Sequence, residues 1–136
     1  MYKAEIANHE IFFDSDNFFI KEKIETLYVT AKMLDYNVRF IYNEYREVGL
    51  SHGFGKITAN PFLRLYIETK IKTVNIILHL DEKNKFKELD ASLNYRNNKY
   101  RNRNFFNIID LPELPGSRNK LYMEFFDLAI DHIITK

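Results

Sequence analysis

Apolar and polar residues alternate over much of the second half of the chain, and this two-residue period constrains the fold more than any other feature. The apolar positions of two such segments are Val74, Ile76, Leu78 and Leu80, and Leu89, Ala91, Leu93 and Tyr95. Successive side chains of a strand point to opposite faces of a sheet. Both segments therefore predict strands with one apolar face.

Further strands are predicted on either side of these two. Residues 2–14 predict a β-hairpin that turns at Asn8–His9, and Val38, Phe40 and Tyr42 alternate as one strand face. The segment 61–72 is ambiguous. Its β-branched and aromatic residues favour a strand, whereas Asn60–Pro61 would suit the start of a helix. Three of the four glycines fall in 48–61, which is predicted to be the longest loop.

Two segments have the spacing of helices. In 17–36 the apolar residues recur every three or four positions (Ile20, Ile24, Leu27, Ala31 and Leu34), with Asp16 or Asn17 as the expected N-cap. The closing helix, capped by Ser117, carries two neighbouring apolar stripes: Leu121, Phe125, Leu128 and His132, and Tyr122, Phe126, Ile130 and Ile133. A helix that is apolar over so much of its girth is expected to pack on two sides. An alternative role for it, as a homodimer interface, stays open.

Together these elements predict the α+β class. We expect one domain spanning 1–136, with a mainly antiparallel sheet of five to seven strands and two helices packed on one face. The predicted order is two strands, a helix, four or five strands and a helix. A chain of 136 residues is large enough to bury a core of this kind.

Composition excludes several classes of protein. The chain has no cysteine, which removes disulfides, thiolate catalysis and cysteine-based metal sites. Its net charge of +1 gives no global preference for nucleic acid or anionic membrane. The first residues lack the apolar run of a signal peptide, and no stretch approaches the length of a membrane span. We therefore expect a soluble cytoplasmic protein that makes no membrane contact.

Motifs for catalysis or cofactor binding are weak. The segment 51–58 has glycines but not the spacing of a phosphate loop, so His52 and Lys56 are only candidates for binding from a surface loop. His79 and Asp81 could share a strand face as metal ligands, and 14–17 lacks the glycine of a calcium loop. We predict no cofactor, no metal and no enzymatic activity, with a small hydrolase or nuclease as a third hypothesis.

The segment 94–104, "NYRNNKYRNRN", is the most distinctive surface. Four cations and no acid occur in it, and Asn97–Asn98 suits a tight hairpin turn. Arginines on such a hairpin favour phosphate or carboxylate, and tyrosines favour stacking or interface anchoring. The predicted partner-binding residues are Tyr95, Arg96, Lys99, Tyr100, Arg101 and Arg103. A charged edge that prevents strand pairing between chains is the structural alternative.

These observations favour a non-enzymatic binding protein that inhibits or neutralises a macromolecular partner. The type would be that of a toxin-neutralising immunity protein or a phage-encoded inhibitor of host defence, and a protein partner is favoured because the domain is nearly neutral. The alternative is a nucleic-acid-binding module that uses the basic hairpin 94–104.

Overall fold

The computed structural model describes residues 1–43, 46–50, 53–57, 61–95, 103–107 and 118–135, with 46–50, 53–57 and 103–107 described by their main chain only. These residues form the following elements: β1 (Tyr2–Ile6), β2 (His9–Phe13), α1 (Phe19–Met33), β3 (Asn37–Asn43), β4 (Arg46–Leu50), β5 (Gly53–Ile57), β6 (Phe62–Glu68), β7 (Lys72–Leu80), β8 (Phe86–Tyr95), β9 (Arg103–Asn107) and α2 (Arg118–Ile134).

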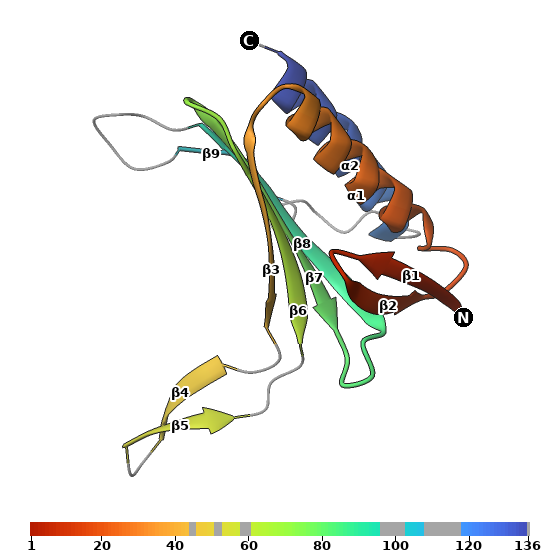
Figure 1. Ribbon diagram of the computed structural model, residues 1–136, viewed down its shortest axis with the longest axis vertical. Coiled ribbons are helices and arrows are strands. Elements are labelled where there is room, and N and C mark those ends of the chain that lie inside the picture. The colour runs from red at the N-terminus through yellow and green to blue at the C-terminus, as the bar shows by residue number, and fades with distance from the viewer. Residues whose placement is uncertain (44–45, 51–52, 58–60, 96–102, 108–117, 136) are drawn as a thin grey trace.

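The main sheet has the strand order β3-β6-β7-β8-β9, and every neighbouring pair is antiparallel. Two further antiparallel pairs, β1–β2 and β4–β5, form separate two-stranded sheets. Both helices lie on one face of the main sheet, and β1–β2 lies on the same side near the start of α1 (Figure 1). The sheet is therefore covered on one face by a layer of helices.

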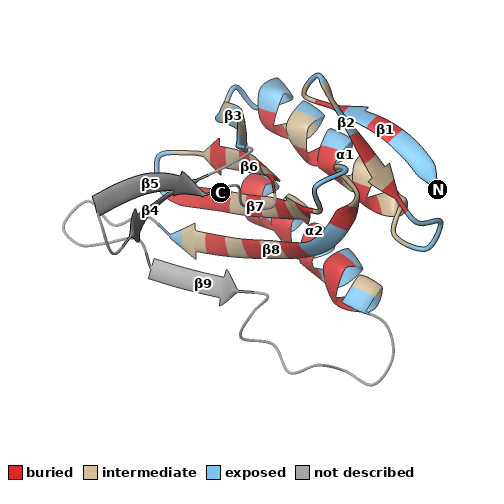
Figure 2. Cartoon of the chain, turned by 90° about the horizontal axis from the view of Figure 1, so that it is seen from below, coloured by how far each residue is buried: buried red, intermediate tan, exposed pale blue. Residues whose placement is uncertain are grey.

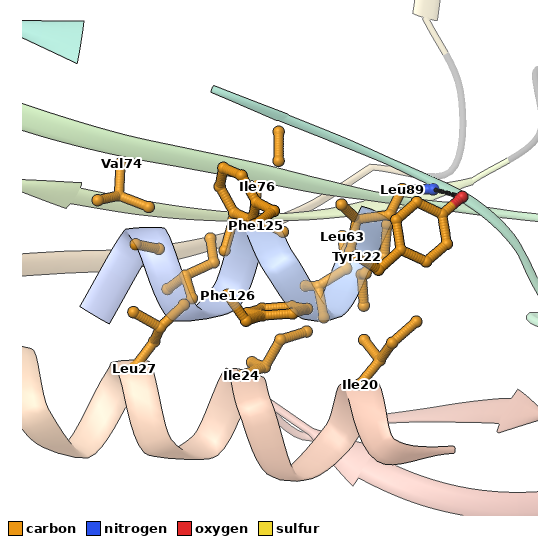
Figure 3. Packing of buried hydrophobic residues seen from close by; sticks show 14 of the residues in the cluster. Ile20, Ile24, Leu27, Leu63, Val74, Ile76, Leu89, Tyr122, Phe125 and Phe126 are labelled. Atoms are coloured by element: carbon orange, nitrogen blue, oxygen red, sulfur yellow. Dashed lines mark hydrogen bonds between the residues drawn. The ribbon is translucent and has the colours of Figure 1, made fainter. Parts of the chain in front are cut away.

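The core lies between this helical layer and the sheet. The apolar residues of β6, β7 and β8 that alternate along each strand are buried, as Figure 2 shows by its red bands. Ile20, Ile24 and Leu27 of α1 face Phe126 of α2, and Phe125 points toward the sheet (Figure 3). The core follows from the spacing of apolar residues in the sequence, because side chains on one face recur about every 2 residues in a strand and about every 3.6 residues in a helix.

The predicted α+β class, with two helices and antiparallel sheets, is confirmed. The finer prediction, in which all strands join one sheet, is not confirmed, because the described strands are divided among three sheets, the largest of five strands. The hairpin 2–14 was predicted, but its turn is at Ala7–Asn8 and not at Asn8–His9, because His9 already pairs with Ile6. This hairpin forms a sheet of its own, and its Ile11 and Phe13 are fully buried in the shared core. Seven described strands, rather than four or five, lie between the helices.

The ambiguous segment 61–72 forms a strand over 62–68. The prediction of a long loop over 48–61 is wrong. β4 and β5 occupy most of that loop as a hairpin. In its register Gly55 lies opposite Val48 and Gly49 opposite Phe54. Each glycine thus pairs with a larger residue across the hairpin. The glycines indicated a loop because glycine is generally disfavoured in strands. This preference is weak, and the neighbours across a strand pair can override it.

Helix α1 is shorter than the predicted 17–36. Phe18 occupies the N-cap position without a side-chain hydrogen bond, so neither Asp16 nor Asn17 is the cap. At the other end Asp35 adopts a positive φ of 60°. The N–H groups of Asp35 and Tyr36 then donate to the carbonyls of Lys32 and Ala31, at 3.0 and 2.9 Å. This pair of bonds is the Schellman arrangement, which ends the helix.

Helix α2 packs on two sides, as its two apolar stripes predicted. It contacts α1 on one side and β7 and β8 on the other. The hydroxyl of Tyr122 accepts a hydrogen bond from the main-chain N–H of Leu89 at 3.2 Å, drawn as the dashed line in Figure 3. Just before Leu89 the pairing of β8 with β7 shifts register. The helix therefore also supplies a partner for the main chain of an irregular strand.

Candidate binding surface

The face of the main sheet that points away from the helices carries the most chemically varied set of side chains. Neither described helix covers it (Figure 1). We call this surface the open face; the strand registers place on it Asn37, Arg39, Ile41, Asn43, Phe62, Arg64, Tyr66, Glu68, Thr73, Asn75, Ile77, His79, Glu88, Asp90, Ser92 and Asn94. These residues alternate with the buried core positions, so the same two-residue period that builds the core also assembles the open face.

A cationic and aromatic cluster occupies the part of the open face nearest to β3. The guanidinium carbons of Arg39 and Arg64 lie 5.3 and 5.2 Å from the centroid of the Tyr66 ring. The Nε of Arg64 also donates to Oδ1 of Asn75 at 2.5 Å. The strand register explains this meeting, since Arg39 lies opposite Tyr66 and Tyr66 opposite Asn75. Three strands thus hold two guanidiniums around one aromatic ring.

Glu68 follows Tyr66 by two positions on the same face, but neither guanidinium of the cluster forms an ion pair with a described residue. Arg39 is exposed and Arg64 is half-buried. Two guanidiniums that stack on a ring retain their in-plane N–H donors, which suit a carboxylate or a phosphate. The cluster is therefore arranged to receive an anionic group.

A second polar pair lies on the central strands. The Nε2 of His79 and Oδ2 of Asp90 are 2.8 Å apart, and both side chains are 35% exposed. His79 was predicted to pair with Asp81 if it held a metal. Asp81 instead accepts hydrogen bonds from the N–H groups of Lys83 and Lys85, at 2.8 and 2.9 Å. The hydrogen bond from Lys85 is the main cause that holds the pKa of Asp81 below its usual value.

The Asp81 carboxylate therefore accepts hydrogen bonds within the turn before β8, which explains why it does not pair with His79. In the described part of the chain, no three histidines or carboxylates converge as metal ligands. His79 and Asp90 form a pair across adjacent strands, and such a pair orients an imidazole without by itself defining a reaction.

The predicted binding hairpin lies at the other edge of the sheet and is only partly described. Tyr95 ends β8, and Arg103 begins β9 directly opposite it. Four of the predicted residues, Arg96, Lys99, Tyr100 and Arg101, lie outside the described residues. Tyr95 is 39% exposed, and its ring contacts the His132 ring edge-on with 5.3 Å between centroids. One of the proposed anchoring tyrosines thus already packs against the end of α2.

The predicted tight turn at Asn97–Asn98 also lies outside the described residues. A two-residue turn there would pair Tyr95 with Tyr100, whereas the described pairing sets Tyr95 opposite Arg103 and Asn94 opposite Asn104. A register shift between Leu93 and Asn94 accompanies this pairing.

Of the two candidates in the glycine-rich segment, the structure describes only the main chain of Lys56, which lies in β5 opposite Glu47. His52 lies outside the described residues. Among the described strands β5 pairs only with β4, so no described pairing brings Lys56 to the open face.

A hollow of about 610 Å³ lies at the end of the core where both helices finish. Its lining includes Asp35, Tyr36, Lys70, Lys72 and Thr135. Lys72 is buried, and its Nζ donates to the carbonyl of His132 at 2.9 Å and to that of Thr135. The Tyr36 hydroxyl donates to the carbonyl of Ile133 at 3.0 Å. Lys72 and Tyr36 thus hold the C-terminus of α2 at this hollow.

The open face was the part of the site that the sequence analysis missed. The signal was present in the segment "FLRLYIE", where Phe62, Arg64 and Tyr66 alternate with the apolar residues that identified the strand. The sequence does not show that Arg39, which lies 27 residues before Tyr66, becomes its neighbour on the adjacent strand.

Comparison with known proteins gives no relative: no protein-family model, curated protein or solved structure matches the chain. Neither described helix is long and apolar enough to cross a membrane.

Proposed function

We propose that the chain is a non-enzymatic binding protein whose open face covers a functional surface of a protein partner. The observation that carries this proposal is the cluster in which Arg39 and Arg64 lie around the Tyr66 ring, on a sheet face that neither described helix covers. Arginine and tyrosine are the residues that most often dominate protein interfaces. A rigid sheet presents them at low entropic cost, because Asn75 already holds the Arg64 side chain.

Inhibition by occlusion is the mode of action that we infer, as in an immunity protein or an anti-defence inhibitor. In this mode the two guanidiniums dock on acidic groups of the partner, and the tyrosine fills the space between them. Electrostatic pairing of this kind accelerates association and weakens as salt increases. The proposal requires no catalytic group and no cofactor.

Binding of single-stranded nucleic acid is the second candidate function. The observation that favours it is the same aromatic ring flanked by guanidiniums, because bases stack on aromatic rings and phosphates pair with arginine. Against it stand the carboxylates of Glu68, Glu88 and Asp90 on the open face, whose charges repel a phosphate backbone.

A site-specific photo-crosslinker distinguishes the two candidates. We would place a benzoylphenylalanine at Ser92, which lies on the open face, and in a matched control at Glu22, which is exposed on α1. Irradiation in a lysate of cells that express the protein should give a discrete adduct from position 92 and none from position 22. The adduct should resist nuclease and be removed by protease. Adducts from both positions, or from neither, would contradict the proposal.

Titration of labelled DNA and RNA supplies the second arm. Binding that falls steeply with salt and is lost in the double variant Arg39→Gln, Arg64→Gln would establish the nucleic-acid function instead. The variant Lys21→Gln, Lys23→Gln on α1 removes the same charge from a different face and serves as the control. We expect no binding below about 100 μM, the weak end of non-specific affinity.

A further inference from the structure

Strand β3 forms an edge of the main sheet. It pairs with β6 on one side, and no described strand pairs with its other side. Every residue from Asn37 to Asn43 is in continuous register with β6, without a bulge. An edge strand directs alternate N–H and C=O groups away from the sheet. Proteins usually protect such an edge with proline, lysine or a bulge, yet β3 contains only Arg39 as a charged residue.

A groove lies beside this edge on the side of the helices. It has a volume of about 450 Å³ and is formed by the β1–β2 turn, by α1 and by Phe40 of β3. We call it the Phe40 groove; it is lined by Glu5, Ile6, Ala7, Asn8, Ile24, Glu25, Tyr28, Val29 and Phe40. Leu65, the neighbour of Phe40 on β6, is 2% exposed, whereas Phe40 is only half-buried. The apolar layer is thus incomplete at the β3 edge.

The two faces of β3 differ in the chemistry that they offer to an added strand. Residues opposite each other on paired strands place their side chains on the same face. A residue added opposite Phe40 would point toward the Phe40 groove, and its neighbour added opposite Arg39 would lie on the open face. Arg39 has no carboxylate partner among the described residues. The edge is therefore complementary to a segment in which apolar and acidic residues alternate.

We propose that β3 binds an extended segment of the protein partner by strand addition, with an apolar side chain in the Phe40 groove and an acidic side chain against Arg39. Main-chain hydrogen bonds supply affinity in this mode, and the pockets for alternate side chains supply specificity. This inference rests on the proposed function, because it names the chemistry of the partner that the open face meets. Seven residues of β3 are available for pairing.

The probe is a fluorescein-labelled peptide of eight residues that alternates Glu and Leu, titrated into the full chain and followed by anisotropy and by amide hydrogen exchange. The expected result is binding, with slower exchange in β3. A peptide that alternates Lys and Leu should bind about tenfold more weakly. The Arg39→Glu variant should reverse this preference, binding the Lys peptide better than the Glu peptide.

Two controls test the separate parts of the proposal. Methylation of alternate main-chain nitrogens of the Glu peptide leaves its charges unchanged but prevents strand pairing, and it should abolish binding. Val29→Lys changes an exposed residue in the groove lining and should weaken binding, whereas Met123→Lys, exposed on α2, should not. Absence of binding by the Glu peptide would overturn the proposal, as would binding that survives methylation or that Arg39→Glu leaves unchanged.

The outcome separates this inference from the proposed function. A protein adduct from position 92 together with no peptide binding retains the binding function and rejects strand addition at β3. Peptide binding with the predicted charge reversal, in the absence of any adduct, supports strand addition and rejects the open face as the contact surface.

Discussion

The Nζ of Lys72 on β7 donates a hydrogen bond to the carbonyl oxygen of His132, 60 residues later, at 2.9 Å. The lysine side chain is buried, and it lies where the last carbonyls of α2 lack partners within the helix. A cation at this end also interacts favourably with the helix dipole. One side chain thus fixes the C-terminal end of the helix to the central strand of the sheet.

Replacement of this lysine should destabilise the fold. We expect Lys72→Met to lower the free energy of unfolding by about 2 kcal/mol, because it removes charge-assisted hydrogen bonds to carbonyls that are partly excluded from water. Urea denaturation followed by circular dichroism measures the change. Lys70→Met, two residues earlier and exposed, is the matched control and should change stability by less than about 0.5 kcal/mol. Equal effects from both variants would show that Lys72 does not cap the helix.

His132 should make stability depend on pH. Burial lowers the pKa of His132 below its ordinary value of 6.5, and the charge of Lys72 lowers it further. Hydrogen bonds to the main chain of Asn94 and Thr73 raise this pKa but do not cancel the decrease. The unfolded chain therefore binds a proton at a higher pH than the folded chain does. Stability is present in full above pH 6.5 and decreases as the pH falls through the window between the unfolded and folded pKa values.

Denaturation of the wild type and of His132→Gln, measured from about pH 7.5 to pH 5, tests this dependence. The variant should have a lower stability at neutral pH but a smaller decrease in acid. Lys72→Met should also reduce the decrease, because one of the groups that opposes protonation is removed. A decrease of the same size in all three proteins would exclude His132 as its source.

Tyr122 should contribute stability through its hydroxyl as well as its ring. Its oxygen accepts the N–H of Leu89 at a buried position next to a register shift in β8. We expect Tyr122→Phe to cost about 1 kcal/mol, since a buried donor loses its partner while the ring packing is retained. Tyr28→Phe is the comparison, because no hydrogen bond of the Tyr28 hydroxyl to a described residue is found. Thermal unfolding of the two variants should therefore differ.

Asp35 should be a position at which glycine stabilises the chain. Its φ of 60° lies in the left-handed region, and a negative charge just after a helix opposes the helix dipole. Asp35→Gly removes both costs while the Schellman hydrogen bonds remain, and we expect an increase in the free energy of unfolding of about 0.5–1 kcal/mol. Asp127→Gly, exposed within α2, should instead lower it by about 1 kcal/mol. A loss of stability in Asp35→Gly would show that the carboxylate has a role of its own.

Much of the local structure followed from sequence periods. The strands at 72–80 and 86–95 and the helix stripe of Ile20, Ile24 and Leu27 were predicted because burial on one face requires an apolar residue at a fixed spacing. The hairpin at 2–14 was predicted from its alternation, although its turn lies one residue earlier than predicted, at Ala7–Asn8. Helix ends were less accurate, since Phe18 and Asp35 occupy positions that residue preferences assign to other residue types.

The candidate site followed from the sequence only in part. Tyr95 and Arg103, two of the predicted binding residues, lie opposite each other on β8 and β9, whereas the predicted turn would have paired Tyr95 with Tyr100. The open face was not predicted. Its residues were identifiable as the second face of each strand. Their grouping depends on which strands become neighbours, and strand order is a long-range choice that no local pattern encodes.

The sequence by itself determined the class of the fold, the buried face of each strand and the helix stripes, because these depend on residues a few positions apart. Only the tertiary structure decided how the strands are shared among sheets, that Arg39 and Arg64 meet at Tyr66, and that Lys72 reaches the end of α2. Arg39 and Tyr66 are 27 residues apart, and Lys72 and His132 are 60 residues apart. The first contact forms because β3 pairs with β6, and the second because α2 packs on β7 as its apolar face is buried.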